Sequence, residues 1–390
     1  MSRRPIALSP DLLRMQNEGY DLDIRGGYLL VRNVPYVDTS GTVRLGILIS
    51  KLELSGDKTV KPTDHVAYWT GEHPCHSDGS KITAIQNSSA PQDFGDGVKA
   101  DHTFSAKAHY RDYHHKMTTY IGRIAGEATK VDPVATARTY QAIAADDESC
   151  VFKYVDTATS RAGIGAVNGK VAGQKIGILG MGGTGAYVFD LVTKTAAAQI
   201  HIFDGDVFSQ HNAFRAPGAP SLEDLEIKPQ KVAYFATLYS NMHKGIVAHD
   251  VYLDETNVAL LDGLDFVFVC IDRGPVKRVV IDRLIANGTP FAEVGMGVVL
   301  HEGQLGGIVR LTTSTPDTRE AAAPHISYAD DDGGANEYAT NIQIAELNSL
   351  NAVIAVMAWK QHFGIYRQSR PHFYTGYSIG SGEFVHESAA

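Results

Sequence analysis

Two patterns of apolar and polar positions divide the chain. In its first part, apolar runs of strand length at 28–31 and 45–49 are separated by polar, turn-forming stretches, a pattern typical of β-strands joined by short loops. We therefore expect a β-rich domain over residues 1–110. Residues 111–165 contain more helix formers, with apolar positions at helical spacing over 117–124. This second stretch predicts a helical connector.

From about residue 174 the pattern changes to short apolar runs that alternate with stretches of helical periodicity. The runs of strand length are 176–179, 200–203, 266–270 and 291–294. Strands that alternate with helices fold as parallel, doubly wound sheets. The expected fold class is therefore α/β, with a doubly wound, Rossmann-like domain over residues 166–390 preceded by the smaller β-rich domain.

Composition refines this picture by exclusion. Of the 390 residues, 44% are hydrophobic and 20% are charged, which is ordinary for a soluble globular protein. The net charge of −9 argues against nucleic-acid binding, which needs a basic surface. The sequence contains no apolar stretch of membrane-spanning length and no signal peptide. We expect a cytoplasmic protein without membrane or nucleic-acid partners.

A glycine-rich loop joins the first strand of the second domain to the helix that follows. Its glycines are Gly180, Gly182, Gly183 and Gly185. Small residues let the backbone approach a phosphate closely, and the free N–H groups of a helix N-terminus attract its negative charge. The loop therefore predicts a nucleotide site, with a plain tight turn as the alternative.

Charged residues after the second strand narrow the choice of nucleotide. Asp204 and Asp206 end this strand, where an acidic residue commonly binds ribose hydroxyls. This feature fits a nicotinamide-dependent oxidoreductase equally well. Arg215 and Lys231 follow, and cations here suit a triphosphate, whose negative charge must be neutralised as pyrophosphate leaves.

Asp272 directly follows the apolar run 266–270. This position is the carboxyl edge of the predicted parallel sheet, where ligands bind. A single carboxylate there suits hydrated Mg²⁺, with phosphate oxygens completing the coordination shell. We therefore expect Asp272 to be the magnesium ligand.

Taken in order, these motifs resemble those of the ThiF/MoeB-type adenylyltransferases, which include the ubiquitin-activating enzymes. The resemblance extends over about residues 155–365. The segments that carry it are the loop from Gly180 to Gly185, Asp204-Gly205-Asp206, Asn212-Ala213-Phe214-Arg215-Ala216, Lys231 and Asp272, with Ser160-Arg161-Ala162 upstream. Two glutamines that follow the arginines in family members are absent after Arg161 and Arg215.

The resemblance implies a reaction and its components. The C-terminal carboxylate of a ubiquitin-like protein attacks the α-phosphate of ATP, which gives an acyl-adenylate and pyrophosphate. It implies ATP and Mg²⁺ as cofactors, Asn212 among the nucleotide-binding residues, and transfer of the acyl group to a conjugating-enzyme-like partner. It also implies a homodimer, in which Arg161 reaches the nucleotide site of the second copy.

The sequence departs from this family in its cysteines. Its three cysteines, Cys75, Cys150 and Cys270, form no Cys-X-X-Cys pair, so we expect no structural zinc. No cysteine follows Cys270, which we expect to be a buried core thiol. Where an acyl-accepting cysteine would be expected, residues 311–320 offer only hydroxyls. Direct transfer to a partner, an oxyester on a hydroxyl with Ser314 as first choice, and a natural cysteine replaced near residues 321–323 all stay open.

Two further questions stay open in the sequence. Residues 342–357 predict an apolar helix, which is either core or a dimer interface. Residues 1–110 carry no chemical motif, and we expect them to bind a partner. Besides adenylation, two functions are compatible with the motifs: an NAD(P)-dependent oxidoreductase, and an ATP-binding scaffold that has the activating-enzyme fold without the activity.

Overall fold

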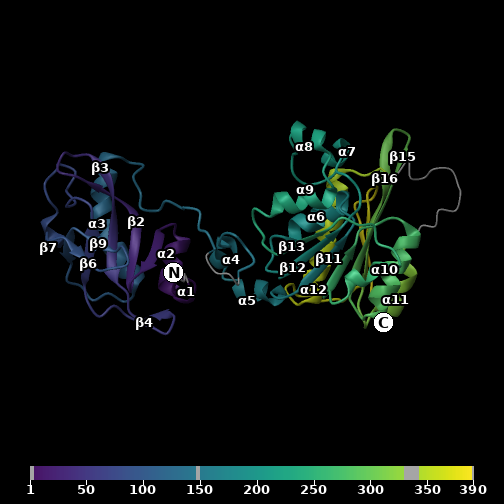
Figure 1. Ribbon diagram of the computed structural model, residues 1–390, viewed down its shortest axis with the longest axis horizontal. Coiled ribbons are helices and arrows are strands. Elements are labelled where there is room, and N and C mark those ends of the chain that lie inside the picture. Colours follow the sequence, from purple (N-terminus) through teal and green to yellow (C-terminus); the bar gives the residue numbers. More distant parts are fainter. Residues whose placement is uncertain (1–3, 146–149, 329–341, 389–390) are drawn as a thin grey trace. The chain divides into compact units, whose positions relative to one another are not determined.

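The structure is a computed structural model (Figure 1) that describes residues 4–145, 150–328 and 342–388. The chain divides into two compact units, the first comprising residues 1–150 and 154–163, the second residues 151–153 and 164–390. Within the described ranges, none of the helices is both long and apolar enough to span a membrane.

The first unit is built on an antiparallel sheet of six strands. In spatial order these strands are β1 (Asp21–Arg25), β2 (Tyr28–Val37), β3 (Val43–Lys51), β6 (Val66–Thr70), β10 (His102–Ser105) and β7 (Gln86–Ser88). Two short hairpins pair β4 (Leu54–Ser55) with β5 (Lys58–Thr59), and β8 (Gln92–Asp93) with β9 (Lys99–Ala100). The helices of this unit are α1 (Arg4–Leu8), α2 (Pro10–Asn17), α3 (Tyr113–Val131), α4 (Thr157–Ala162) and the 3₁₀ turn Thr83–Ile85.

Helix α3 belongs to the core of this first unit. Asp112 caps its N-terminus by accepting a hydrogen bond from the backbone N–H of His115 at 2.7 Å. One face of the helix, including Met117 and Tyr120, packs into the same apolar cluster as Trp69 of β6. The helix expected within residues 111–165 therefore forms, but it packs on the sheet of the first unit instead of bridging two domains, because its apolar face needs a partner surface.

The second unit contains an eight-stranded sheet. In spatial order its strands are β13 (Ile246–His249), β12 (Gln199–Phe203), β11 (Lys175–Leu179), β14 (Phe266–Val269), β15 (Phe291–His301), β16 (Gln304–Ser314), β17 (Tyr374–Ser378) and β18 (Phe384–Glu387). The first five strands are parallel, and the last three extend the sheet in antiparallel fashion. The predicted doubly wound α/β fold is confirmed.

Helices cover both faces of this sheet, as the alternating side chains of β14 show. Phe266 and Phe268 lie in one apolar cluster with residues of α6, α9 and α12, whereas Val267 and Val269 lie in a second cluster with residues of α10. The helices of this unit are α5 (Gly165–Asn168), α6 (Gly183–Val192), α7 (Gln210–Ala213), α8 (Leu222–Ile227), α9 (Lys231–Tyr239), α10 (Gly274–Ala286), α11 (Arg319–Ala322), α12 (Ala345–His362) and the 3₁₀ turns Gly169–Val171, Val258–Leu261 and Ala323–His325.

The order of the strands fixes where a ligand can bind. From β11 the chain proceeds to β12 and β13 on one side, and then to β14 and β15 on the other. The connections therefore leave β11 and β14 in opposite directions, and a crevice opens at the carboxyl ends of these two strands.

Candidate functional site

A cavity of about 960 Å³ lies at this switch in strand order. Residues of the second unit line it, from the glycine loop after β11, the ends of β12 and β14, strand β15 and helix α12. Of the residues singled out from the sequence, those on the cavity wall are Gly180, Gly182, Gly183, Asp204, Asp206, Arg215, Lys231, Cys270 and Asp272. The fold thus brings together motifs that are far apart in the sequence.

The glycine loop approaches the neighbouring backbone too closely for side chains. At Gly180, φ is +86° and an added Cβ would lie 2.7 Å from the carbonyl oxygen of Cys270. A Cβ on Gly185 would lie 1.8 Å from the carbonyl oxygen of Gly180, so Gly185 allows the tight turn without facing the cavity. Gly182 caps α6 without a side-chain hydrogen bond, which leaves the first N–H groups of the helix available to an anion.

Asp204 holds the glycine loop in place. One of its carboxylate oxygens accepts the backbone N–H of Met181 at 2.7 Å, and the other accepts the N–H of Asp206 at 2.8 Å. We expected Asp204 to bind a ribose. In the structure each of its oxygens accepts one backbone N–H, which makes Asp204 a positioning residue for the loop, and its contact with a ribose stays a prediction.

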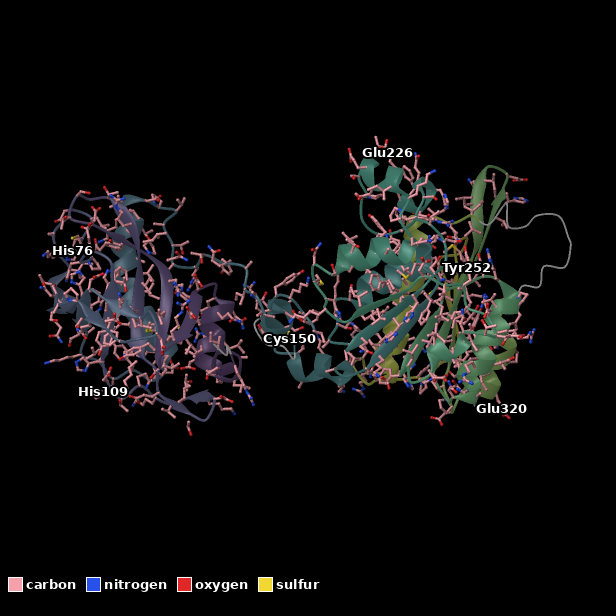
Figure 2. All side chains as sticks on the ribbon, in the orientation of Figure 1. His76, His109, Cys150, Glu226, Tyr252 and Glu320 are labelled. Atoms are coloured by element: carbon pink, nitrogen blue, oxygen red, sulfur yellow. The ribbon has the colours of Figure 1, made fainter. Side chains whose placement is uncertain are left out.

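Asp206 and Lys231 form an ion pair at the cavity wall. The Nζ atom of Lys231 lies 2.7 Å from Oδ2 of Asp206 and 3.6 Å from Oδ2 of Asp204. The hydroxyl of Tyr252, labelled in Figure 2, donates to the other oxygen of Asp206. Burial acts to raise the pKa of Asp206, but the hydrogen bonds from Lys231 and Tyr252 outweigh it and lower that pKa. Asp206 is therefore an anion at neutral pH.

Arg215 adds a second cation to this wall. Its Nε atom is buried and, among the described residues, meets no hydrogen-bond acceptor. Burial lowers the pKa of Arg215, while the carboxylates of Asp272 and Asp206 act in the opposite direction. A guanidinium that keeps an unused donor beside a cavity is suited to an anionic ligand.

Asn212 lies in the short helix α7, three residues before Arg215. Its side chain is 2% exposed, and its Oδ1 accepts the backbone N–H of Ser209 at 2.8 Å, which caps helix α7. It does not line the cavity. The expected contact between Asn212 and a nucleotide stays a prediction, and in this structure the side chain caps α7.

Cys270 and Asp272 follow β14 and line the cavity. Cys270 is half-buried: it packs against the apolar core, and it also lines the cavity. Desolvation, reinforced by Glu293, raises the pKa of its thiol far above the usual value. The thiol is therefore neutral at physiological pH and a poor nucleophile.

Two asparagines of α12 were missed in the sequence because they lie within an apolar helical run. Asn348 accepts a hydrogen bond from the hydroxyl of Thr184 at 3.0 Å and donates to the carbonyl of Arg215 at 3.1 Å, so it connects the glycine loop with the arginine. Asn351 donates to the carbonyl of Gly295 at 3.1 Å. The sequence does hold one signal for them, which is two asparagines three residues apart on one apolar helix, because buried amides need hydrogen-bond partners.

An ion-pair network was also missed. Glu293, which is 0% exposed, accepts hydrogen bonds from Lys277 at 2.8 Å and from Arg310 at 2.7 Å. Both cations line the cavity. No sequence motif predicts this network, because Lys277, Glu293 and Arg310 come from α10, β15 and β16 and come into contact only when the sheet forms.

Two expected site residues lie elsewhere. Ser314 ends β16, is 1% exposed and pairs with Phe291 of β15. It is not placed to accept an acyl group, which corrects our expectation. Arg161 belongs to the first unit, where its guanidinium lies 5.4 Å from the centre of the Tyr140 ring. Among the described residues, no group of three or more His, Cys, Asp or Glu side chains is arranged to hold a metal ion.

Residues 342–357, which the sequence left open as core or dimer interface, fall largely within helix α12 (Ala345–His362). Its buried positions Ala352, Ala355 and Trp359 lie in the apolar core with β14 and α6. Val353 and Met357 are exposed, at 37% and 45%. One face of the helix therefore belongs to the core, another leaves apolar side chains exposed, and the helix carries polar groups to the cavity.

Comparison with known sequences finds two family models that match parts of this chain. Residues 162–376 match the ThiF family. Residues 10–157 match a domain of unknown function, DUF6791. No curated protein matches the sequence.

Comparison with solved structures finds proteins similar to part of this chain. Escherichia coli MccB with succinimide has a TM-score of 0.45 at 15% identity, over 57% of this chain and 66% of that one. MccB with ATP has a TM-score of 0.46 at 15% identity, over 57% and 65%. PaaA has a TM-score of 0.42 at 17% identity, over 57% and 75%. The match thus spans just under two thirds of the MccB chains.

Proposed function

The chain belongs to the ThiF family, and from this premise we propose that it is an ATP-dependent adenylyltransferase that activates the C-terminal carboxylate of a ubiquitin-like protein. One observation carries the proposal. The glycine loop, Arg215, Lys231 and Asp272 line a single cavity at the switch in strand order. An oxidoreductase would need the loop and an acidic residue, but not the two cations.

The reaction requires little acid–base chemistry. A carboxylate is already ionised at neutral pH, and one of its oxygens attacks the α-phosphorus of ATP. The new bond joins this oxygen to phosphorus, and the bond from phosphorus to the bridging oxygen breaks, so that pyrophosphate leaves with the electron pair. Positioning the two anions and neutralising their charge are the main tasks of the protein.

The residues of the cavity suit these tasks. Arg215 has a buried, unused Nε donor, with which it would hold a phosphate oxygen. Lys231 is kept at the wall by Asp206, and its ammonium has further donors for phosphate. Asp272 would hold Mg²⁺, which, when bound, screens the charge of the phosphates.

We further propose that the acyl group passes directly to a conjugating-enzyme-like partner. The neutral Cys270 thiol and the buried Ser314 hydroxyl are both poor acceptors.

We propose a homodimer in which Arg161 completes the nucleotide site of the second copy. This part rests on the Ser160-Arg161 segment and on the exposed apolar residues Val353 and Met357 of α12. The first unit would bind a protein partner.

Two measurements test the proposal. The first compares thermal unfolding with Mg²⁺–ATP and with NAD, because a ligand stabilises the state that binds it. Stabilisation by NAD and not by ATP would support the oxidoreductase instead. The second is exchange of labelled pyrophosphate into ATP with candidate ubiquitin-like proteins that end in glycine. ATP binding without exchange for any of them would favour the scaffold.

A further inference from the structure

The wall of the cavity formed by β15 and α12 has a chemistry that the nucleotide does not explain. Gly295 of β15 pairs directly with Arg310 of β16. An added Cβ on Gly295 would lie 2.4 Å from Nη2 of Arg310, so the guanidinium lies over this glycine. The carbonyl of Gly295 accepts the hydrogen bond from Asn351. Three elements therefore meet at one backbone unit, and all three residues line the cavity.

The charges at this wall leave a positive excess. Glu293 is bonded through Oε1 to Lys277 at 2.8 Å and to Nη2 of Arg310 at 3.2 Å, and through Oε2 to Nη1 of Arg310 at 2.7 Å. One carboxylate is thus shared by two cations, of which Lys277 is 4% and Arg310 19% exposed in the side chain. Cations in so little solvent are costly unless an anion balances them, and both face the cavity.

Asn351 adds an unused acceptor beside this charge. Its Nδ2 atom is committed to Gly295, which fixes the orientation of the amide. Its Oδ1 atom is buried, with no donor among the described residues. A buried carbonyl oxygen without a partner is unfavourable, so this oxygen is suited to an N–H group brought by a ligand.

An anion and an N–H donor occur together in the last residue of a polypeptide. Its carboxylate carries the charge and its amide carries the N–H, whereas a phosphate chain has no N–H to offer. We propose that Arg310 and Asn351 form the subsite for the C-terminal residue of the substrate, with Glu293 and Lys277 as positioning residues for Arg310. The inference rests on the proposed adenylation, and it specifies a polypeptide carboxylate with a secondary amide.

The subsite serves the reaction in a defined way. The carboxylate must approach the negative triphosphate, and the two repel each other strongly when solvent is scarce. Arg310 holds one carboxylate oxygen and offsets this repulsion, while Asn351 accepts the terminal N–H and fixes the direction of the second oxygen toward the α-phosphorus. A terminal residue without an N–H, such as proline, would bind poorly.

Binding of three acetylated glycine tripeptides to the full chain tests the subsite without a known protein substrate. One tripeptide has a free carboxylate, one has a C-terminal amide, and one ends in N-methylglycine and so lacks only the last N–H. Binding is measured by ligand-detected NMR with Mg²⁺ and the non-hydrolysable ATP analogue AMPCPP. We expect the free acid to bind at least tenfold more tightly than either of the other peptides.

Variants assign the two contacts separately. R310Q is expected to weaken free-acid binding at least tenfold with the affinity for AMPCPP unchanged. N351A is expected to abolish the discrimination against N-methylglycine. R278Q, which changes an exposed arginine of α10 outside the cavity, serves as the matched control and should change neither affinity. If R310Q unfolds, R310K takes its place in the test. It retains the positive charge without the planar guanidinium and should weaken the binding of the free acid but not of AMPCPP.

Several results would overturn the subsite. Equal binding of acid and amide would do so, and so would an R310Q protein that loses AMPCPP affinity and keeps peptide affinity. Wild-type protein that binds AMPCPP but not the free acid also contradicts the inference, while the proposed nucleotide chemistry survives. Failure to bind AMPCPP at all would instead contradict the proposed function itself.

Discussion

Lys231, the first residue of α9, is joined to Asp206 twice: its backbone N–H donates to the carbonyl of Asp206 at 2.9 Å, and its Nζ lies 2.7 Å from the Asp206 carboxylate. The contact ties the start of a helix to the segment that follows β12. It holds a cation with 7% side-chain exposure beside the cavity. Breaking it should therefore affect both stability and ligand binding.

The first prediction concerns the pH dependence of this pair. The pKa of Asp206 is lowered in the folded state, so its contribution to stability is present above its ordinary pKa of 3.8 and is lost as the pH falls through the lower folded value. We expect D206N to lower the free energy of unfolding by about 1 kcal/mol at pH 7. This difference from wild type should shrink below about pH 4. Urea unfolding at pH 7, 5 and 3 measures it.

The control for this prediction is D250N, at an exposed aspartate after β13 that does not line the cavity. It should leave stability within about 0.5 kcal/mol of wild type at each pH. A D206N difference that stays constant down to pH 3 would contradict the assignment.

The second prediction concerns magnesium. Wild-type protein should gain about 2.7 kcal/mol of stability when Mg²⁺–ATP is present at a hundredfold excess over its Kd. D272A should lose most of this gain and should not catalyse pyrophosphate exchange, while its ligand-free unfolding temperature stays close to that of wild type. Removing Mg²⁺ with EDTA should have the same effect on wild type. If D272A still catalyses exchange, Asp272 has no part in the mechanism.

The third prediction concerns assembly. R161A and D272A should each be inactive in pyrophosphate exchange. If Arg161 acts on the second copy, unfolding and refolding the two variants together should restore part of the activity, because a mixed dimer contains one site with both residues intact. A monomer by light scattering that is fully active would exclude this arrangement.

The fourth prediction concerns the cysteines. Adenylation uses a carboxylate nucleophile, so replacing Cys75, Cys150 and Cys270 together with alanine should leave pyrophosphate exchange within about threefold of wild type, which is less than about 1 kcal/mol in activation free energy. Because the pKa of Cys270 is raised, iodoacetamide at pH 8 should label it much more slowly than a free thiol. A reductant-sensitive adduct with the substrate that disappears in C270A would contradict both statements.

The sequence alone specified the second domain well, because its signals are local. A glycine loop between a strand and a helix, an acidic strand end and the apolar runs each reflect the geometry of a few consecutive residues. Asp206, Arg215, Lys231 and Asp272 could be chosen from their order along the chain, and the structure brings them to one cavity. How each acts in catalysis stays a prediction.

Other site features could not be found from local patterns. Asn351 looked like one polar residue in an apolar helix, and Glu293 like a carboxylate in a buried strand. Asn212 matched a nucleotide-binding motif, yet here it caps α7. Residue type and order along the chain do not show which face of a helix or strand each side chain occupies.

What the sequence by itself determined was the α/β fold and the set of phosphate-binding candidates, since both depend on the periodicity and spacing of neighbouring residues. Only the tertiary structure decided that Lys277, Arg310 and Asn351 share one wall of the cavity, and that the buried Glu293 accepts hydrogen bonds from both cations. They come from α10, β15, β16 and α12, and their contacts depend on the register between β15 and β16 and on the packing of α12. Long-range pairing of this kind leaves no periodic trace along the chain.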